Sequence, residues 1–119
     1  MPPVLVAGAV IECVHGGRYR LPGPGAPALT VSGHGALVMG AEAGRSFAPG
    51  SPGLLTPCSF STAAGPQPCV TAPALPAGLS RKLTVGGRPV LLATANGTST
   101  SNPGTWLVGD PGQQLLEAI

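Results

Sequence analysis

Short apolar runs separated by glycine and proline dominate the pattern of this chain. The first run, from Val4 to Val14, is rich in β-branched residues and alternates in the way that is typical of a strand. A later run, Thr105–Val108, precedes a Gly-Asp-Pro-Gly turn and predicts a last strand. The pattern therefore favours short strands joined by loops.

One apolar pattern occurs twice, in the segments 29–38 and 83–92. Each copy has a Leu-Thr-Val run, a glycine turn and a second apolar run, and each is preceded by a Cys-Val pair. Gly33 and Gly87 occupy the equivalent place, where a tight hairpin needs a positive φ. We expect a duplicated hairpin unit whose copies pack on one another, although Leu-Thr-Val-x-Gly can also recur by chance.

Composition supports an all-β fold. The 119 residues include 19 glycines and 15 prolines, which leave hardly any stretch free to form a long helix. Because 43% of residues are hydrophobic and only 8% are charged, the chain is not expected to be disordered. We predict a single domain over residues 1–119 with seven to nine short strands and long Pro/Gly loops. We also expect a loop from Gly16 to Ala28, a hairpin turn at Asn96-Gly97 and a helical turn or two within Gln113–Ile119.

Charge and targeting signals narrow the classes of protein. A net charge of +2 and four aromatic residues give neither a phosphate-tracking surface nor a stacking platform, so no nucleic-acid partner is expected. The N-terminal apolar run lacks a positive region before it, which argues against a secretory signal. Seven prolines interrupt the uncharged stretch 46–80, so it cannot form a membrane helix. We expect a soluble protein that is made in the cytoplasm.

The three cysteines and one histidine form the candidate site. Cys13 and His15 lie two residues apart on the predicted strand, so their side chains should leave the same face. Gly16-Gly17 would let the backbone turn beside a ligand, while Cys58 and Cys69 each follow a proline. Cys13, His15, Cys58 and Cys69 would together make a tetrahedral structural zinc site.

Other interpretations of these residues stay open at this point. The cysteines could be small hydrophobic core residues, or Cys58 and Cys69 could form a disulfide and leave Cys13 free. His34 lies between two glycines at the turn of the first repeat, and we expect it to be a solvated turn residue rather than a ligand.

Catalysis finds little support in the sequence. No Asp lies near a His, and the His-x-Glu and Pro-Cys-x-x-Cys pattern of zinc deaminases is broken. No phosphate-binding glycine loop is present either. A hydrolase that uses His15 or His34 is the weakest alternative, and we do not expect an enzyme.

These motifs together resemble a known family. The start Gly8-Ala9-x-x-x-Cys13-x-His15-Gly16-Gly17, the paired Leu-Thr-Val hairpins, Pro57-Cys58-Ser59-Phe60, Pro68-Cys69 and Gly87-Arg88-Pro89-Val90-Leu91-Leu92 are similar to the PAAR-like spike tip proteins of contractile injection systems. The resemblance covers the chain from Val4 to about Trp106. It implies a small conical β-rich domain with a pseudo-threefold arrangement and one zinc ion near its point, with Cys13, His15, Cys58 and Cys69 at the motif positions.

The resemblance also implies a function and partners. Family members cap a trimeric VgrG-like spike, one tip per trimer, and sharpen it for piercing the target cell envelope. We therefore expect a non-enzymatic structural protein, assembled at the tip of a cytoplasmic or released particle, with transient contact to the target membrane and a possible cargo effector. The alternative is a small zinc- or disulfide-stabilised β module that binds a glycan or a protein surface through Trp106 and Tyr19.

Overall fold

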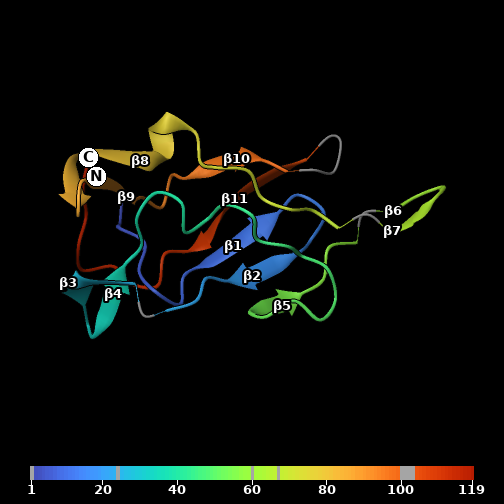
Figure 1. Ribbon diagram of the computed structural model, residues 1–119, viewed down its shortest axis with the longest axis horizontal. Coiled ribbons are helices and arrows are strands. Elements are labelled where there is room, and N and C mark those ends of the chain that lie inside the picture. Colours follow the sequence, from blue (N-terminus) through green and yellow to red (C-terminus); the bar gives the residue numbers. More distant parts are fainter. Residues whose placement is uncertain (1, 24, 60, 67, 100–103) are drawn as a thin grey trace.

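The computed structural model describes residues 2–23, 25–59, 61–66, 68–99 and 104–119, and it is an all-β structure (Figure 1). The described elements are β1 (Val10–Cys13), β2 (Arg18–Arg20), β3 (Ala26–Val31), β4 (His34–Ala36), β5 (Leu54–Thr56), β6 (Ser61–Thr62), β7 (Gly65–Pro66), the 3-10 turn η1 (Pro76–Gly78), β8 (Leu79–Val85), β9 (Arg88–Leu91), β10 (Asn96–Thr98) and β11 (Thr105–Asp110). The predicted fold class is confirmed, and the described residues hold eleven strands rather than seven to nine.

The molecule is elongated, with principal extents of 45 × 25 × 22 Å. Its two termini and the hairpins β3–β4 and β8–β9 lie at one end, and the β6–β7 hairpin lies at the other (Figure 1). A five-stranded sheet occupies the middle. The conical outline implied by the family resemblance stays a prediction.

The central sheet is antiparallel, in the order β10-β11-β1-β2-β5. Its middle strand β1 buries Val10, Ile11 and Cys13, which explains why the run before Val14 is so apolar. Cys13 is opposite Trp106 of β11, whose indole N–H donates to the carbonyl of Ala72 at 2.9 Å. The sheet thereby carries the first cysteine to the base of the β6–β7 end.

The two similar segments found in the sequence both form hairpins, β3–β4 and β8–β9. Their turns contain Gly33 at φ 81° and Gly87 at φ 81°, so the predicted requirement for a positive φ is confirmed. Each hairpin has an irregular register in its middle. A common origin of the two hairpins by duplication stays a prediction.

Three apolar segments at the end with the termini bind one another in a closed ring. The segments are 4–9 (VLVAGA), 36–41 (ALVMGA) and 90–95 (VLLATA). Their central leucines are linked by backbone hydrogen bonds of 2.9 Å, from Leu5 N–H to Leu91 O, from Leu91 N–H to Leu37 O, and from Leu37 N–H to Leu5 O. Each segment therefore donates to one neighbour and accepts from the other.

Further backbone hydrogen bonds repeat the same order around the ring. The outer set joins Ala7 N–H to Gly35 O, Met39 N–H to Pro89 O and Ala93 N–H to Pro3 O, at 2.8, 2.9 and 2.8 Å. Each segment ends in a turn, closed by Ala9 N–H to Val6 O, Ala41 N–H to Val38 O and Ala95 N–H to Leu92 O. The bridges Val4↔Leu92, Val6↔Ala36 and Val38↔Val90 complete the pattern. We call this arrangement the threefold ring, because every one of these contacts occurs three times in cyclic order.

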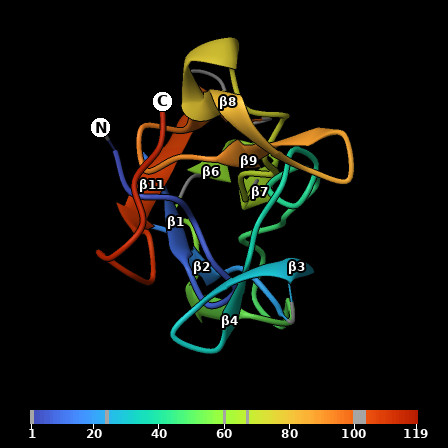
Figure 2. The same ribbon diagram turned by 90° about the vertical axis from the view of Figure 1, so that its left-hand side faces the viewer.

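Seen along the long axis, the parts that carry the ring surround a common centre (Figure 2). The terminal segments lie to one side, with the β8–β9 hairpin above and the β3–β4 hairpin below. Leu5, Leu37 and Leu91 point into the main core, which also contains all three cysteines. Val4 and Val90 belong to a second apolar cluster with Ala118, as expected where neighbouring residues of a strand face opposite sides.

Several sequence-based expectations about elements were wrong. The predicted loop over residues 16–28 contains β2, because the buried ring of Tyr19 gives this short segment an apolar anchor between two exposed arginines. Asn96-Gly97 lies inside β10 rather than at a turn, since Gly97 packs against the indole of Trp106, where a Cβ would lie 2.6 Å from Nε1. The predicted strand 4–14 is regular only in Val10–Cys13, because Gly8 at φ 95° turns the chain at the end of the first ring segment.

The C-terminal prediction was also wrong. Residues 113–119 form no helical turn and instead follow the ring as an irregular segment. The amide of Gln113 donates to the carbonyls of Val4 and Leu116, and its Oε1 accepts from the N–H groups of Leu115 and Leu116. Among the described residues, no helix has the length and apolarity needed to cross a membrane.

The threefold ring leads to a stability prediction. Leu37→Ala should lower the free energy of unfolding by about 2–5 kcal/mol, because the side chain is 3% exposed and its loss leaves a cavity at the centre of the ring. Leu107→Ala is the control, since that side chain lies on β11 and is 44% exposed, and it should cost less than about 1 kcal/mol. Denaturant unfolding measures both values. Equal losses in the two variants would contradict a central role for the ring.

Candidate metal centre

Four side chains from three separate parts of the chain meet at the base of the β6–β7 hairpin. Cys13 ends β1, His15 lies in the turn before β2, and Cys58 and Cys69 flank the hairpin. One ligand atom from each of the four residues lies within 4.8 Å of the others. Nδ1 of His15 is 3.3 Å from Sγ of Cys69, which is 3.5 Å from Sγ of Cys58. The cysteines are buried and His15 is half-buried.

His15 reaches the cluster from a turn, which corrects its predicted place on a strand. The chain reverses over residues 14–17, and Gly16 adopts a φ of 85°, a conformation that is costly for other residues. The reversal brings the imidazole back toward the sulfur of Cys69. The Gly16-Gly17 pair therefore has the predicted function of turning the backbone beside the cluster.

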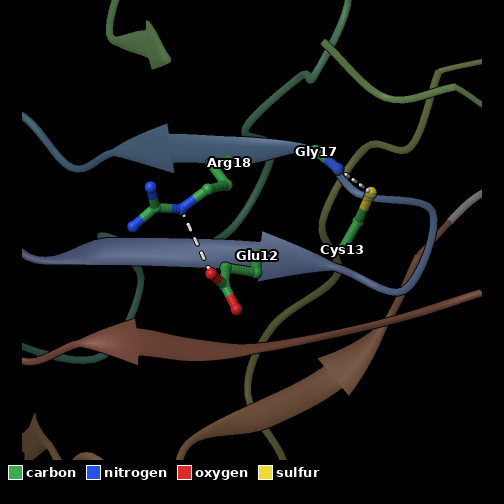
Figure 3. Close-up of polar contacts among 4 residues, drawn as sticks. All are labelled: Glu12, Cys13, Gly17 and Arg18. Atoms are coloured by element: carbon green, nitrogen blue, oxygen red, sulfur yellow. Dashed lines mark hydrogen bonds and ion pairs between the residues drawn. The ribbon is translucent and has the colours of Figure 1, made fainter. Parts of the chain in front are cut away.

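Gly17 makes room for the sulfur of Cys13 and also donates to it. Its N–H lies 3.2 Å from Sγ of Cys13 (Figure 3). A Cβ at Gly17 would lie 2.9 Å from that sulfur and 2.8 Å from Cδ1 of Phe47, which is too close for any larger residue without movement. An N–H that donates to a thiolate stabilises it, so this contact suits a metal ligand.

The loops that carry the other cysteines are fixed by backbone hydrogen bonds. Phe47 donates its N–H to Cys69 O at 2.9 Å and accepts from the N–H of Cys58 at 3.1 Å. The hydroxyl of Ser59 donates to the carbonyl of His15 at 2.7 Å. Phe47 is fully buried and its ring packs edge-on against Tyr19, with centroids 6.1 Å apart. The two hairpin-flanking cysteines are thus held against the β1–β2 turn.

A buried carboxylate fastens the loop that follows Cys69. Glu42 is fully buried, and its two oxygens accept from the N–H groups of Gly40 at 2.7 Å and Ala74 at 2.8 Å. The hydroxyl of Thr71 donates to the carbonyl of Glu42 and accepts from the N–H of Arg45. Because Gly40 belongs to the threefold ring, Glu42 connects the ring to the chain segment that positions Cys69.

The donor set fits a tetrahedral metal ion. Thiolate ligands about 2.3 Å from zinc at tetrahedral angles lie roughly 3.8 Å from one another, and a nitrogen ligand lies slightly closer. The separations of 3.5 Å between two sulfurs and 3.3 Å between nitrogen and sulfur are close to these values. Three sulfurs and one imidazole are ligands that zinc and other borderline or soft cations prefer. The cluster could therefore hold one metal ion.

Without a cation, the site disfavours the thiolate of Cys13. Burial raises the pKa of the Cys13 thiol to about 12, and the neighbouring thiols of Cys58 and Cys69 add to the rise, while backbone hydrogen bonds from His15 and Gly17 oppose it. A metal ligand must be deprotonated, so binding of a cation would release the proton of Cys13. The buried sulfur environment is thus suited to an ion rather than to a reactive free thiolate.

The structure brings together all four residues predicted as ligands and leaves His34 out. His34 is exposed at the start of β4, as expected for a solvated turn residue. The three cysteines are not joined by a disulfide, so the alternative with a Cys58–Cys69 disulfide is not what the structure has. Tyr19 and Trp106 were expected as ligand contacts in the alternative function. This was wrong, because they are 5% and 0% exposed.

Sequence reasoning missed the residues that support the cluster. Gly17 was singled out only for turning, while Phe47 and Glu42 were not singled out at all. Glu42 carried a usable signal, since it is one of only four acidic residues in the chain and the residues on either side of it are small and apolar.

No family model, curated protein or solved structure matches this chain. The kind of ion that the cluster can bind is therefore inferred from its own donor atoms.

The cluster predicts metal binding with a defined stoichiometry. The folded protein should bind one divalent metal ion per chain, and Cys58→Ser should weaken binding by more than about 100-fold, because it removes a direct ligand. His34→Ala should leave the affinity unchanged. Metal content by mass spectrometry and competition with a chromogenic chelator measure both. Metal-free protein with the same denaturant midpoint as metal-loaded protein would contradict a stabilising site.

The Glu42 contacts predict a specific cost for an isosteric change. Glu42→Gln places an amide NH₂ opposite one of two backbone N–H groups, so one donor loses its acceptor in a fully buried position. The free energy of unfolding should fall by about 1–3 kcal/mol. Glu117→Gln, at an exposed position, should change it by less than about 0.5 kcal/mol. Matching effects in the two variants would show that Glu42 does not fasten the loop.

Proposed function

We propose that this chain is a PAAR-like, non-enzymatic tip that caps a trimeric VgrG-like spike of a contractile injection system. The threefold ring is the observation that carries the proposal. A chain built around three near-equivalent, buried backbone segments has a pseudo-threefold arrangement at this end, which suits a partner made of three equivalent subunits. The hairpins β3–β4 and β8–β9 extend from two of these segments at the same end of the molecule (Figure 2).

The other end of the molecule supports a piercing role. The β6–β7 hairpin lies farthest from the termini, and the four-residue cluster lies at its base. The chain carries only 8% charged residues, which lowers the dehydration cost of brief contact with a target membrane. We assign the cluster to a structural zinc ion held by Cys13, His15, Cys58 and Cys69. A zinc ion there would pin the hairpin to the sheet where a chain of this size has little core.

A structural role also agrees with the closed ligand set. Four protein ligands leave no open coordination position for water or substrate, which a catalytic zinc site requires. The proposal therefore includes no enzymatic activity of the chain itself. In this proposal the tip is made in the cytoplasm and assembled on the particle, and a cargo effector could dock on it as a separate chain.

Co-assembly with the spike tests the proposal. The purified chain, mixed with a trimeric VgrG-like spike protein encoded in the same genome, should form a complex with one chain per trimer, because one tip covers the end of the trimer's symmetry axis. Native mass spectrometry measures this ratio. The metal-site variant Cys58→Ser, folded at low temperature, is mixed with the spike in the same way, to measure whether formation of the complex depends on the metal centre. A chain that stays monomeric beside an intact trimer, or binds three per trimer, would contradict the proposal.

A further inference from the structure

A groove of about 1010 Å³ runs beside the central sheet, separate from the metal centre. Its lining includes the segment 52–55, which enters β5, and the segment 19–23. Gly33 and His34, where the β3–β4 turn passes into β4, also line it. The volume is at the upper end of the range for small-molecule sites, so the groove suits a longer ligand.

Two of the three charged residues that line the groove are positive. Arg20 and Arg45 line it together with Asp110, and His34 adds an imidazole. Nε of Arg45 donates to the carbonyl of Ala41 at 2.9 Å, so part of its guanidinium is held in place. Asp110 accepts from the N–H of Gly112 at 2.8 Å. Within the described part of the chain, the one ion pair joins Arg18 to Glu12, so the groove arginines are not neutralised by a carboxylate there.

The rest of the lining is mostly apolar. Leu55 is 44% exposed, Leu54 is half-buried, and both lie in the groove. Gly53 adopts a φ of 86°, and a Cβ there would lie 2.7 Å from the carbonyl of Arg20, so the two segments approach as closely as glycine allows. The aromatic residue that lines the groove, Tyr19, is 5% exposed and offers no face for stacking a base. These features favour a polypeptide over a nucleic acid.

We propose that this groove binds an extended peptide of alternating acidic and apolar side chains. The acidic side chains would pair with Arg20 and Arg45 and accept a hydrogen bond from the imidazole of His34, and the apolar ones would cover Leu54 and Leu55. Opposite charge gives such a peptide its orientation and association rate, while the apolar contacts supply much of the affinity. The inference does not depend on the spike-tip function, because no residue of the metal centre or of the three ring leucines lines the groove.

A labelled peptide tests this inference directly. A short fluorescein-labelled peptide alternating Glu and Val should bind the full chain in fluorescence polarisation, and a matching peptide with Lys in place of Glu should not. Arg20→Glu and His34→Glu should each weaken binding about tenfold, because each turns an attractive contact into a repulsive one. Arg81→Glu makes the same charge change on exposed β8, outside this groove, and should change affinity less than about twofold.

Each other outcome overturns the inference. Equal weakening by Arg20→Glu and Arg81→Glu would mean that net charge alone attracts the peptide. Tighter binding of a single-stranded oligonucleotide than of the acidic peptide would assign the groove to a phosphate polymer. Concentration-dependent dimers that Arg20→Glu dissolves would assign it to a second copy of this chain. Circular dichroism of each variant checks that the fold is unchanged, and His34→Glu keeps the test valid should Arg20→Glu fail to fold.

Discussion

The closed ring of backbone hydrogen bonds among the segments around Leu5, Leu37 and Leu91 is the constraint on which the rest of the structure depends. A chain so rich in glycine has a high conformational entropy to lose on folding. Cyclic pairing helps to offset this cost, because every segment has two partners and none is left as an edge. Removal of one segment would therefore leave the other two with one partner each.

The main core connects the threefold ring to the metal centre. The same apolar cluster that contains the three ring leucines contains Phe47, Trp106 and the three cysteines. β1 follows directly from the first ring segment and ends at Cys13, while Glu42 ties the second ring segment to the loop beyond Cys69. Two of the four candidate ligands are thus positioned by chain that leaves the ring. His15 and Cys58 come from turns and loops, and their positions rest on local contacts such as the bond from Ser59 to the carbonyl of His15.

The sequence allowed the fold class, both hairpins and the four clustered residues to be predicted, for identifiable reasons. A glycine at the turn between two short apolar runs, as at Gly33 and Gly87, indicates a positive φ angle from the local sequence alone. Cys and His are the residue types that metals such as zinc prefer. The first ring segment, 4–9, was not recognised as a third copy. It has no hairpin of its own, and its likeness to 36–41 and 90–95 is a short apolar pattern that any buried strand shares. β2 was missed for a related reason. Its only apolar residue is Tyr19, and besides the neighbouring β1 it pairs with β5, which lies far along the chain.

The ring also bears on how one chain could meet three identical subunits. Its backbone contacts repeat three times, but its side chains do not. Ala7 and Ala93 are replaced by Met39, which is 41% exposed, and Gly8 and Gly40 are replaced by Thr94. The side chains therefore depart from the threefold pattern in two of the three segments, at Met39 in one and at Thr94 in another. If the chain caps a trimeric spike, it can bind in three orientations that are related by rotation about the trimer axis and are equal in energy. In each orientation, the three subunits contact different side chains of the tip. Such an arrangement limits the complex to one tip, because the end of the symmetry axis can be covered only once.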